Sequence, residues 1–272
     1  MDALYNAAKP RVVAIGGPTA TGKTALSVAL AKRFGGEIIS ADSMQIYQGL
    51  DVGTAKVTPE EMQGVPHHLV GFLAPEQAFS VADFTTLAGK TITQLTAQGK
   101  LPLVVGGTGL YITSLLNGIG FTPEKVDPAI RQELQARLQT EGSQALYAEL
   151  AAVDPGYAAK VHPNNTPRVI RALELYRATG RKMSAEREAA RPAEKPYRSL
   201  CLCLTCRDRT LLYQRIDTRC DRMMQSGILE EAKLVYDHRD TYRTAAQAIG
   251  YKEFFPYFEG TADLESCLAH LK

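Results

Sequence analysis

The chain has 272 residues, of which 45% are hydrophobic and 22% charged, with a formal net charge of +2 at pH 7. This composition is that of a globular protein and excludes a disordered or fibrous chain. Because the net charge is so small, any surface that binds nucleic acid must be local and not a property of the whole molecule. No apolar run reaches the roughly 18 residues of a membrane span, and residues 1–10 lack the apolar core of a signal peptide, so no membrane partner is expected. Five cysteines, an odd number, favour reduced thiols and a cytoplasmic protein.

The first expected element is a strand at residues 11–15, which a glycine-rich loop and a helix follow. The loop has the spacing of a P-loop and reads Gly17, Pro18, Thr19, Ala20, Thr21, Gly22, Lys23, Thr24. Glycines let successive backbone N–H groups converge on one anion, and the start of the following helix adds to the positive field. Lys23 supplies a positive charge for terminal phosphate oxygens, and the Thr24 hydroxyl suits a Mg²⁺ ion. The sequence therefore predicts a phosphate-binding enzyme.

Further strands and helices alternate after this loop. A strand at residues 37–41 ends at Asp42, a helix spans residues 82–98, and a strand at residues 101–105 ends in Gly-Gly-Thr at 106–108. Such alternation predicts an α/β fold of P-loop type, with a mostly parallel sheet flanked by helices. The ligand is expected at the carboxyl ends of the strands.

Asp42 is the acidic residue that closes a strand near the loop. An ATPase or GTPase would usually place an aspartate at the end of the strand at residues 101–105, but this chain has glycines there. Asp42 is therefore interpreted as a general base toward an acceptor substrate. A role in the outer coordination shell of Mg²⁺ is the alternative.

The pattern changes after residue 119. Residues 120–199 show helical stretches at 129–139 and 166–179 but no strand, and an apolar strand at 200–204 is expected to be buried and to return to the sheet. We therefore predict three segments: residues 1–119 as the first part of the P-loop core, 120–199 as an all-helical insertion domain, and 200–272 as the return to the core with C-terminal helices.

Two features near this return have alternative interpretations. Cys201, Cys203 and Cys206 are interpreted as buried small residues rather than as metal ligands, because no second close pair of Cys or His accompanies them. Residues 161–198 contain nine Lys or Arg and four Glu. Composition alone favours a solvated helix face for this basic stretch.

Three strings together are more specific than a P-loop alone. They are GPTATGKT at 17–24, DSMQIY at 42–47 with DVGTAK at 51–56, and GGTGLY at 106–111. In these strings the chain closely resembles the bacterial tRNA dimethylallyltransferases, also called isopentenyl-diphosphate:tRNA transferases. Further matches are PHH at 66–68, DPxxR at 127–131, PRVIRALE at 167–174, RI at 215–216 and AIGYK at 248–252.

The resemblance implies transfer of a dimethylallyl group from dimethylallyl diphosphate to N6 of the adenosine immediately 3′ of the tRNA anticodon. The P-loop would then hold a diphosphate leaving group with Mg²⁺ as cofactor, which accounts for the missing strand-end aspartate. The resemblance adds Arg215 to the diphosphate site and places Thr108 between donor and base. The implied catalytic residues are Asp42, Lys23, Thr24, Thr108 and Arg215.

The resemblance also implies an RNA partner, the anticodon stem-loop, whose target base is drawn out of its stack. It favours RNA contact over a solvated face for the basic stretch, and we expect a monomer. The implied tRNA-binding residues are Asp42, Ser43, Met44, Gln45, Thr108, Arg131, Pro167, Arg168, Val169, Ile170, Arg171, Gln247, Gly250 and Tyr251.

Two departures and two rival functions remain. The family commonly has Gln where this chain has Pro167, although Thr166 and Pro167 can still start a helix as N-cap and first-turn proline. Family members usually continue past the position of Lys272 into a basic helix, so tRNA affinity could be weakened. The rivals are prenylation of a free adenine nucleotide, which needs no helical insertion, and a small-molecule kinase that uses Asp42 as its base.

Overall fold

The computed structural model describes residues 9–121, 127–190, 192 and 194–272. The chain forms two compact units, one made of Met1–Asn117 with Lys195–Lys272 and the other of Gly118–Glu194. The second unit thus begins two residues before the boundary drawn from the sequence at 120 and ends five residues before the one at 199. The later boundary differs because the strand that returns to the sheet already begins at Arg198.

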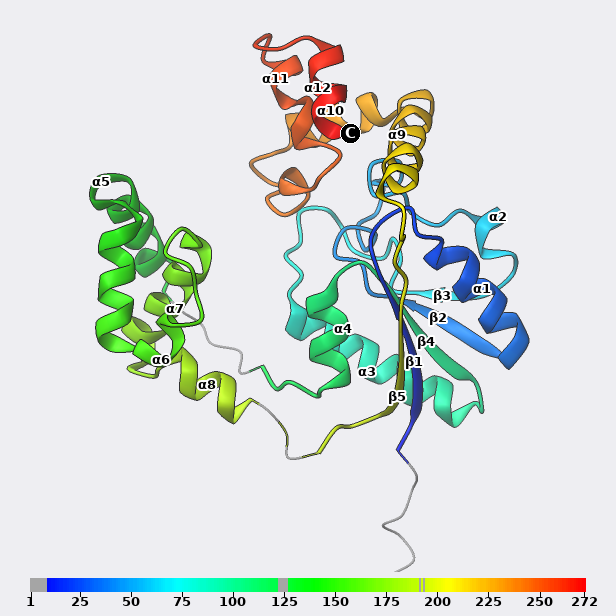
Figure 1. Ribbon diagram of the computed structural model, residues 1–272, viewed down its shortest axis with the longest axis horizontal. Helices are drawn as coiled ribbons and strands as arrows, with labels where there is room; N and C mark the ends of the chain where they lie inside the picture. The colour runs from blue at the N-terminus through cyan, green and yellow to red at the C-terminus, as the bar shows by residue number, and fades with distance from the viewer. Residues whose placement is uncertain (1–8, 122–126, 191, 193) are drawn as a thin grey trace, which may run out of the picture. The chain divides into compact units, whose positions relative to one another are not determined.

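The first unit contains a five-stranded sheet in the order β3-β2-β4-β1-β5, and every strand pair is parallel (Figure 1). Its strands are β1 (Arg11–Gly16), β2 (Gly36–Ser40), β3 (His67–His68), β4 (Leu101–Gly106) and β5 (Arg198–Cys203). The expected parallel α/β sheet is confirmed. Strand β3 was not expected, because two residues are too few to show an alternating pattern.

Alternating side chains of the strands bury the two faces of this sheet. Ile15, Ile38 and Leu103 pack with helix α1 (Lys23–Phe34) on one face. Ala14, Ile39 and Val104 share the core of the other face with α3 (Val81–Ala97) and α4 (Gly109–Leu116). The two sets of partners follow from the period of two along each strand. The short helix α2 (Pro59–Met62) follows the loop after β2.

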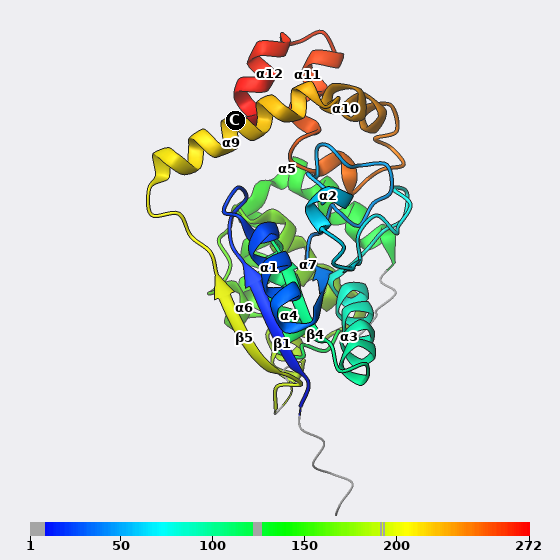
Figure 2. The ribbon, with the colours of Figure 1, turned by 90° about the vertical axis from the view of Figure 1, so that its right-hand side faces the viewer.

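The expectation that the strand near residues 200–204 is buried was wrong. Strand β5 lies at the edge of the sheet and pairs only with β1 (Figure 2). Leu200 is 58% exposed, and Cys201 and Cys203 are also exposed. The apolar sequence misled because an edge strand is hydrogen-bonded on one side only, and its side chains are covered only where a helix packs over them.

The C-terminal helices of the first unit lie beyond the carboxyl ends of the strands (Figure 1). They are α9 (Arg209–Gln225), α10 (Ile228–Asp237), η1 (Ala245–Gln247), η2 (Lys252–Phe254), α11 (Phe255–Phe258) and α12 (Leu264–Leu271). Their core includes Ile228, Val235 and Phe254 and also takes up Tyr47 and Leu50 from the loop after β2. This shared core fixes that loop at the ligand-binding end of the sheet.

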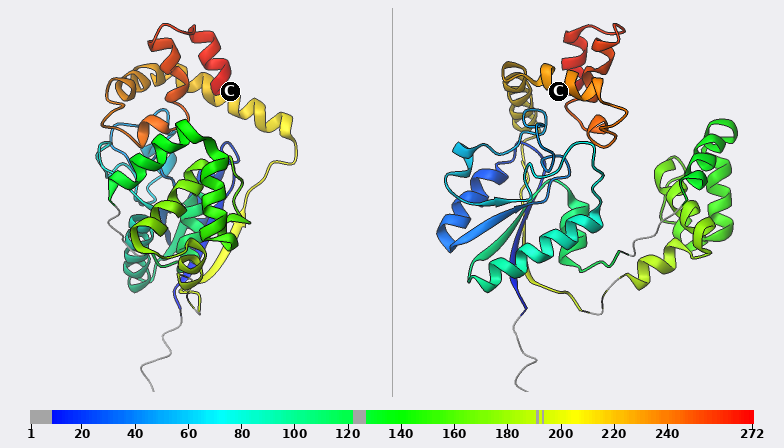
Figure 3. Two further views of the ribbon diagram at one scale, coloured as in Figure 1. Left: turned by 90° about the vertical axis from the view of Figure 1, so that its left-hand side faces the viewer. Right: turned by 180° about the vertical axis from the view of Figure 1, so that it is seen from behind.

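The second unit is helical and has its own core of apolar side chains, including Leu134, Leu150 and Leu173. Its helices, drawn in green in Figure 3, are α5 (Pro128–Val153), α6 (Pro155–Ala158), α7 (Thr166–Thr179) and α8 (Met183–Ala189). Helix α7 has the predicted bounds, but its N-cap is Asn165 and no side chain caps it. The expectation that Thr166 caps this helix was wrong, because Thr166 is already its first helical residue.

No helix in the described part of the chain has both the length and the apolar character that crossing a bilayer requires.

Candidate active site

The loop between β1 and α1 is shaped by two glycines. Gly17 has φ 144°, and a Cβ there would lie 2.4 Å from the carbonyl oxygen of Leu204, so only glycine allows this close approach. Gly22 has φ 87° at the N-cap of α1. The Lys23 ammonium group donates to the carbonyl oxygens of Gly17 at 2.9 Å and Pro18 at 2.6 Å. The lysine therefore folds back over the loop, in the position of a P-loop lysine.

Asp42 directly follows the buried residue Ala41 at the end of β2. Its Oδ1 accepts hydrogen bonds from the backbone N–H groups of Met44 at 2.9 Å and Gln45 at 3.2 Å. This turn fixes the carboxylate, and no hydrogen bond from the described residues reaches its Oδ2. One oxygen thus orients the group while the other remains available to a substrate.

The end of β4 lies against the end of β2. A Cβ on Gly106 would lie 2.1 Å from the carbonyl oxygen of Ala41, so a side chain there would push the two strand ends apart. Two residues later, the Thr108 N–H donates to Ala41 O at 3.2 Å, and Thr108 Oγ1 accepts from the Ser43 N–H at 3.1 Å. These contacts place Thr108 beside the turn that holds Asp42.

Helix α9 supplies arginines to the same site. Arg215 and Arg219 both line the cavity at the carboxyl ends of the strands. Arg219 is the more buried of the two, and this burial lowers its pKa, which Cys220 and Asp42 partly oppose. Arg219 was missed by the sequence analysis. It could have been found from its spacing of four residues from Arg215, which puts both arginines on one face of the helix.

Three charged groups act on one another across this cavity. Burial lowers the pKa of Lys23, the positive charge of Arg219 lowers it further, and Asp42 raises it. The cavity has a volume of about 1060 Å³. It brings together the predicted residues Thr19, Ala20, Thr21, Gly22, Lys23, Thr24, Asp42, Gln45 and Arg215. The remaining P-loop residues, Gly17 and Pro18, and three residues beside Asp42, which are Ser43, Met44 and Thr108, do not line it.

The donor set fits a Mg²⁺ ion that is held mainly by a substrate. Thr24 and Asp42 both line the cavity and offer oxygen atoms. The described residues contain no group of three or more His, Cys, Asp or Glu side chains that could hold a metal. Mg²⁺ is typically bound through one or two protein oxygens together with phosphate oxygens and water, which needs no larger cage.

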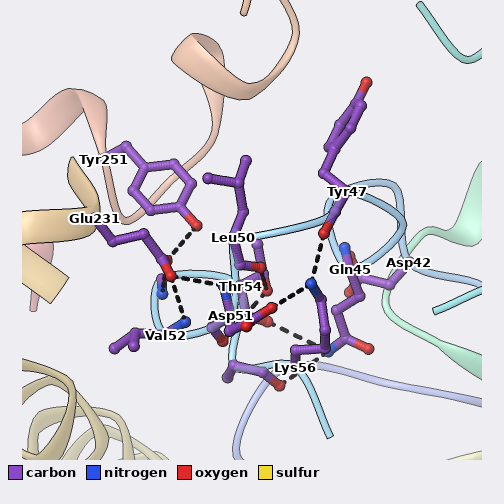
Figure 4. Close-up of polar contacts among 12 residues, drawn as sticks. Asp42, Gln45, Tyr47, Leu50, Asp51, Val52, Thr54, Lys56, Glu231 and Tyr251 are labelled. Atoms are coloured by element: carbon purple, nitrogen blue, oxygen red, sulfur yellow. Dashed lines mark hydrogen bonds and ion pairs between the residues drawn. The ribbon is translucent and has the colours of Figure 1, made fainter. Parts of the chain in front are cut away.

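Gln45 is engaged within the protein. Its Nε2 donates to the carbonyl oxygens of Thr54 at 3.3 Å and Ala55 at 3.0 Å, and its Oε1 accepts from Ser40 Oγ at 3.4 Å (Figure 4). The amide therefore connects the end of β2 to the loop at residues 51–56. An RNA contact by Gln45 would have to share these hydrogen bonds.

The predicted RNA-binding residues near the C-terminus differ in exposure. Gln247 is exposed, whereas the Gly250 N–H is buried and donates to Glu253 Oε2 at 2.8 Å. Tyr251 is 0% exposed, and its hydroxyl donates to Glu231 Oε1 at 2.7 Å. The ring of Tyr251 is therefore part of the core and does not form an open RNA surface.

In the helical unit, Glu174 organises the arginines expected to bind RNA. Arg131 donates to both carboxylate oxygens of Glu174 at 2.9 Å, and Arg171 donates to Oε2 at 2.8 Å. Glu174 is 4% exposed, while the side chains of Arg131 and Arg171 are about half exposed. The two arginines are thus fixed by a buried carboxylate and remain accessible.

The other predicted residues of α7 divide between its two faces. Arg168 and Pro167 are exposed, but Val169 and Ile170 are 1% and 7% exposed and pack in the core of the helical unit. Arg131, Pro167 and Ile170 line a separate cavity of about 620 Å³ within this unit.

Comparisons with known families agree with this geometry. A family model described as IPP transferase matches residues 45–272, and one described as isopentenyl transferase matches residues 10–70. The tRNA dimethylallyltransferase of Bacillus subtilis (strain 168) is 49% identical over 267 residues, covering 98% of this chain and 84% of that protein. The corresponding protein of Halalkalibacterium halodurans is 46% identical over 264 residues, covering 97% of this chain and 84% of that protein.

Solved structures are similar as well. A crystal structure of a full-length tRNA isopentenylpyrophosphate transferase from Bacillus halodurans aligns with a TM-score of 0.67 at 45% identity, covering 97% of this chain and 82% of that one. A eukaryotic dimethylallyltransferase acting on tRNA aligns with a TM-score of 0.78 at 32% identity, covering 96% of this chain and 66% of that one.

Proposed function

The chain belongs to the IPP transferase family, and from this premise we propose that it acts as a tRNA dimethylallyltransferase through the cavity at the carboxyl ends of its strands. The reaction transfers a dimethylallyl group from dimethylallyl diphosphate to N6 of the adenosine immediately 3′ of the anticodon, and it releases diphosphate. The observation that carries this assignment is that Lys23, Arg219 and Asp42 open onto one cavity. This cavity therefore places cationic groups that can bind a polyanion beside a carboxylate.

The cationic side of the cavity suits the donor. When the allylic C–O bond breaks, its electron pair goes to the diphosphate oxygen, where negative charge develops. The P-loop N–H groups, Lys23, Arg215 and Arg219 would stabilise that charge, and they need little rearrangement because the fold already places them. The Thr24 hydroxyl would help to hold Mg²⁺ with the diphosphate, and the ion would supply positive charge at the leaving group. A role for Asp42 in the outer shell of the ion stays the alternative to its role as base.

Asp42 is proposed to act on the acceptor. The adenine N6 amine is a poor base because its lone pair is delocalised into the ring, and its proton becomes acidic as the C–N bond forms. An ionised carboxylate can take that proton. The turn holds Asp42 Oδ1, and no hydrogen bond from the described part of the chain occupies Oδ2. Thr108, which is hydrogen-bonded to Ser43 of that turn, is proposed to help place the base.

The RNA partner is proposed to be the anticodon stem-loop. Asp42 to Gln45 would lie at the extruded base, while Arg131, Arg168 and Arg171 would contact neighbouring phosphates from the helical unit. The side chains of Arg131 and Arg171, which are about half exposed, support this assignment. The cytoplasmic location and monomeric state expected from the sequence stay predictions.

The assignment is tested by mass analysis of nucleosides from hypomodified tRNA after incubation with the protein, dimethylallyl diphosphate and Mg²⁺. We expect an adenosine carrying one dimethylallyl group, formed without ATP. Phosphoryl transfer from ATP to a small acceptor with unmodified tRNA would instead indicate a kinase. Prenylation of a free adenine nucleotide with unmodified tRNA would indicate the sibling chemistry.

Asp42→Ala and Asp42→Asn together test the role of the carboxylate. Both variants should lower the rate of transfer by about 10²- to 10⁴-fold, because neither can take the proton. The asparagine keeps an oxygen that can accept the turn's hydrogen bonds, so it controls for the structure of the turn. Binding of inorganic diphosphate, measured by calorimetry, should change little. Loss of Mg²⁺-dependent diphosphate binding in both variants would assign Asp42 to the metal instead.

A further inference from the structure

One carboxylate of the C-terminal helices holds a loop of the active site. Glu231 lies on α10, outside every motif of the sequence analysis, and its side chain points at the loop after β2 (Figure 4). Its Oε2 accepts from the backbone N–H groups of Asp51 at 2.7 Å and Val52 at 3.0 Å. Its Oε1 accepts from the Gly53 N–H at 2.8 Å and from the Tyr251 hydroxyl at 2.7 Å. Four donors thus converge on one carboxylate.

The packing around these hydrogen bonds leaves the loop little freedom. A Cβ on Gly53 would lie 2.3 Å from a ring carbon of Tyr251, so the ring rests directly on the loop backbone. Gly250, with φ 108°, also lies against this loop, since a Cβ there would lie 3.1 Å from the carbonyl oxygen of Gly53. The Tyr251 ring is fully buried. The loop can therefore occupy this position only while Glu231 and Tyr251 keep theirs.

Hydrogen bonds continue from this loop to the proposed base. The carbonyl oxygens of Thr54 and Ala55 accept from Gln45 Nε2, and the Gln45 N–H donates to Asp42 Oδ1 (Figure 4). On the same loop, Lys56 Nζ donates to Tyr47 O at 2.5 Å and is paired with Asp51. We call residues 42–56 the acceptor wall. Glu231 therefore connects the acceptor wall to α10 by hydrogen bonds.

We propose that Glu231 is a positioning residue for the transfer reaction, which sets the acceptor wall and with it Asp42 against the incoming adenine. The inference rests on the proposed function. It predicts an effect on the acceptor and none on the donor. The P-loop follows β1 and Asp42 follows β2, with β4 between these strands, and the hydrogen bonds of Glu231 among the described residues go to residues 51–53 and Tyr251 rather than to the P-loop. A carboxylate suits the role because it only accepts hydrogen bonds, and all four groups facing it are donors.

The experiment compares Glu231→Gln with Glu230→Gln. The first variant replaces one carboxylate oxygen by an N–H₂ group, which is itself a donor. The donors that faced that oxygen therefore lose their acceptor. The second removes the same charge from the exposed neighbouring position of the same helix and is the matched control. We expect Glu231→Gln to lower kcat/KM for tRNA by about 10- to 100-fold, because small misplacements of reacting groups have effects of that size. Glu230→Gln should behave as the wild type.

Two readouts separate positioning from a general loss of structure. In Glu231→Gln, hydrogen exchange should accelerate at the amides of residues 51–53, while those of β1 and β4 stay protected, and the Kd for inorganic diphosphate should stay within about twofold of wild type. Tyr251→Phe, which removes one of the four hydrogen bonds, should give a smaller loss of kcat/KM.

The inference is overturned if Glu231→Gln transfers at the wild-type rate, or if diphosphate binding and sheet protection fall together with transfer. It is equally overturned if Glu230→Gln has the same effect as Glu231→Gln. Failure of the wild-type protein to prenylate tRNA would count against the proposed function itself. The exchange of residues 51–53 would still show whether Glu231 holds the acceptor wall.

Discussion

The surroundings of Lys23 disfavour the charged form of its side chain. Burial and the nearby Arg219 lower the pKa of its ammonium group, and Asp42 partly restores it. The charged form of Lys23 therefore exists up to a lower pH than that of a free lysine. The charged form of Lys23 attracts the diphosphate. Arg219 adds positive charge to the site, but by lowering the pKa of Lys23 it also limits the pH range over which the site binds diphosphate.

The affinity for inorganic diphosphate should consequently fall with rising pH, and the fall should begin below the ordinary pKa of lysine. Arg219→Gln removes one cause of the lowering, so the fall should move to higher pH although overall affinity is weaker. Asp42→Asn removes the group that raises the pKa, so the fall should move to lower pH. Calorimetric titration without added metal, at a series of alkaline pH values, measures both midpoints. Shifts in the same direction for both variants would show that Lys23 is not the titrating group.

At the scale of single residues, the sequence predicted the site only in part. Lys23, Thr24 and Asp42 could be found because each occupies a fixed place after a strand, and the fold brings strand ends together. Arg219 and Glu231 lie on helices α9 and α10 without a local motif. Their roles depend on which face of a helix meets the sheet, and that is decided by tertiary packing rather than by local pattern.

Glu174 of helix α7 is a buried carboxylate that holds two arginines proposed to contact RNA. Burial alone would raise the pKa of Glu174, but hydrogen bonds from Arg131 and Arg171 outweigh it, so the pKa lies below its usual value. The stabilisation from this group is therefore present at neutral pH and is lost as the pH falls through the lowered pKa. The arginines are half exposed, whereas the carboxylate is buried.

This asymmetry predicts unequal effects of substitution. Replacing Arg131 and Arg171 together by alanine should destabilise the helical unit by about 3 kcal/mol, because a buried carboxylate loses both partners. Glu174→Gln should cost less, since the released guanidinium groups can be hydrated where they stand. Chemical denaturation of the full chain, followed by hydrogen exchange at Leu134 and Leu173, compares the two. Equal losses would mean that the carboxylate is better solvated than its burial indicates.

Arg168 offers a cleaner test of RNA contact by the same helix. Its side chain is exposed and has no ion pair among the described residues, so its removal should leave the unit folded. Arg168→Ala should weaken tRNA binding and reduce the slope of log K against log salt by about 1, because one phosphate contact is lost. Exposed Lys160→Ala, just before the segment at 167–171, is the control. An unchanged slope for Arg168→Ala would indicate that this face of α7 is a solvated surface that does not contact RNA.

At the scale of elements, periodicity was a good guide where it was strong. Strands β1, β2 and β4 and helices α3 and α7 lie within one or two residues of their expected bounds. Burial of β5 could not be predicted, because its apolar residues do not reveal that no further strand pairs beyond it. The strand β3 was too short to detect.

At the scale of the whole molecule, the chain leaves its sheet after α4 and returns at β5. The helical unit between these points has an apolar core of its own, distinct from the two cores that cover the sheet. Each unit therefore has the packing that independent folding requires.

Replacing residues 118–194 by a short Gly/Ser linker should accordingly leave diphosphate binding intact, while tRNA binding should weaken because Arg131, Arg168 and Arg171 are removed. The physical reason is that the P-loop, Asp42 and Arg219 all belong to the first unit. Calorimetry with inorganic diphosphate and filter binding with tRNA give the two measurements. Loss of diphosphate binding in a protein that still unfolds cooperatively would mean that the helical unit contributes to the donor site.

The pairing of β1 with β5 also affects how the protein emerges from the ribosome. Arg11 pairs with Arg198, so β1, β2, β3 and β4 are all made before the helical unit and their fifth partner only after it. At about 5–20 residues per second, synthesis of the intervening unit takes roughly 4–15 s. During that interval one edge of β1, now in the interior of the sheet, is unpaired and able to capture other strands. The inserted helical unit thus also lengthens the time during which the nascent sheet has an unpaired inner edge.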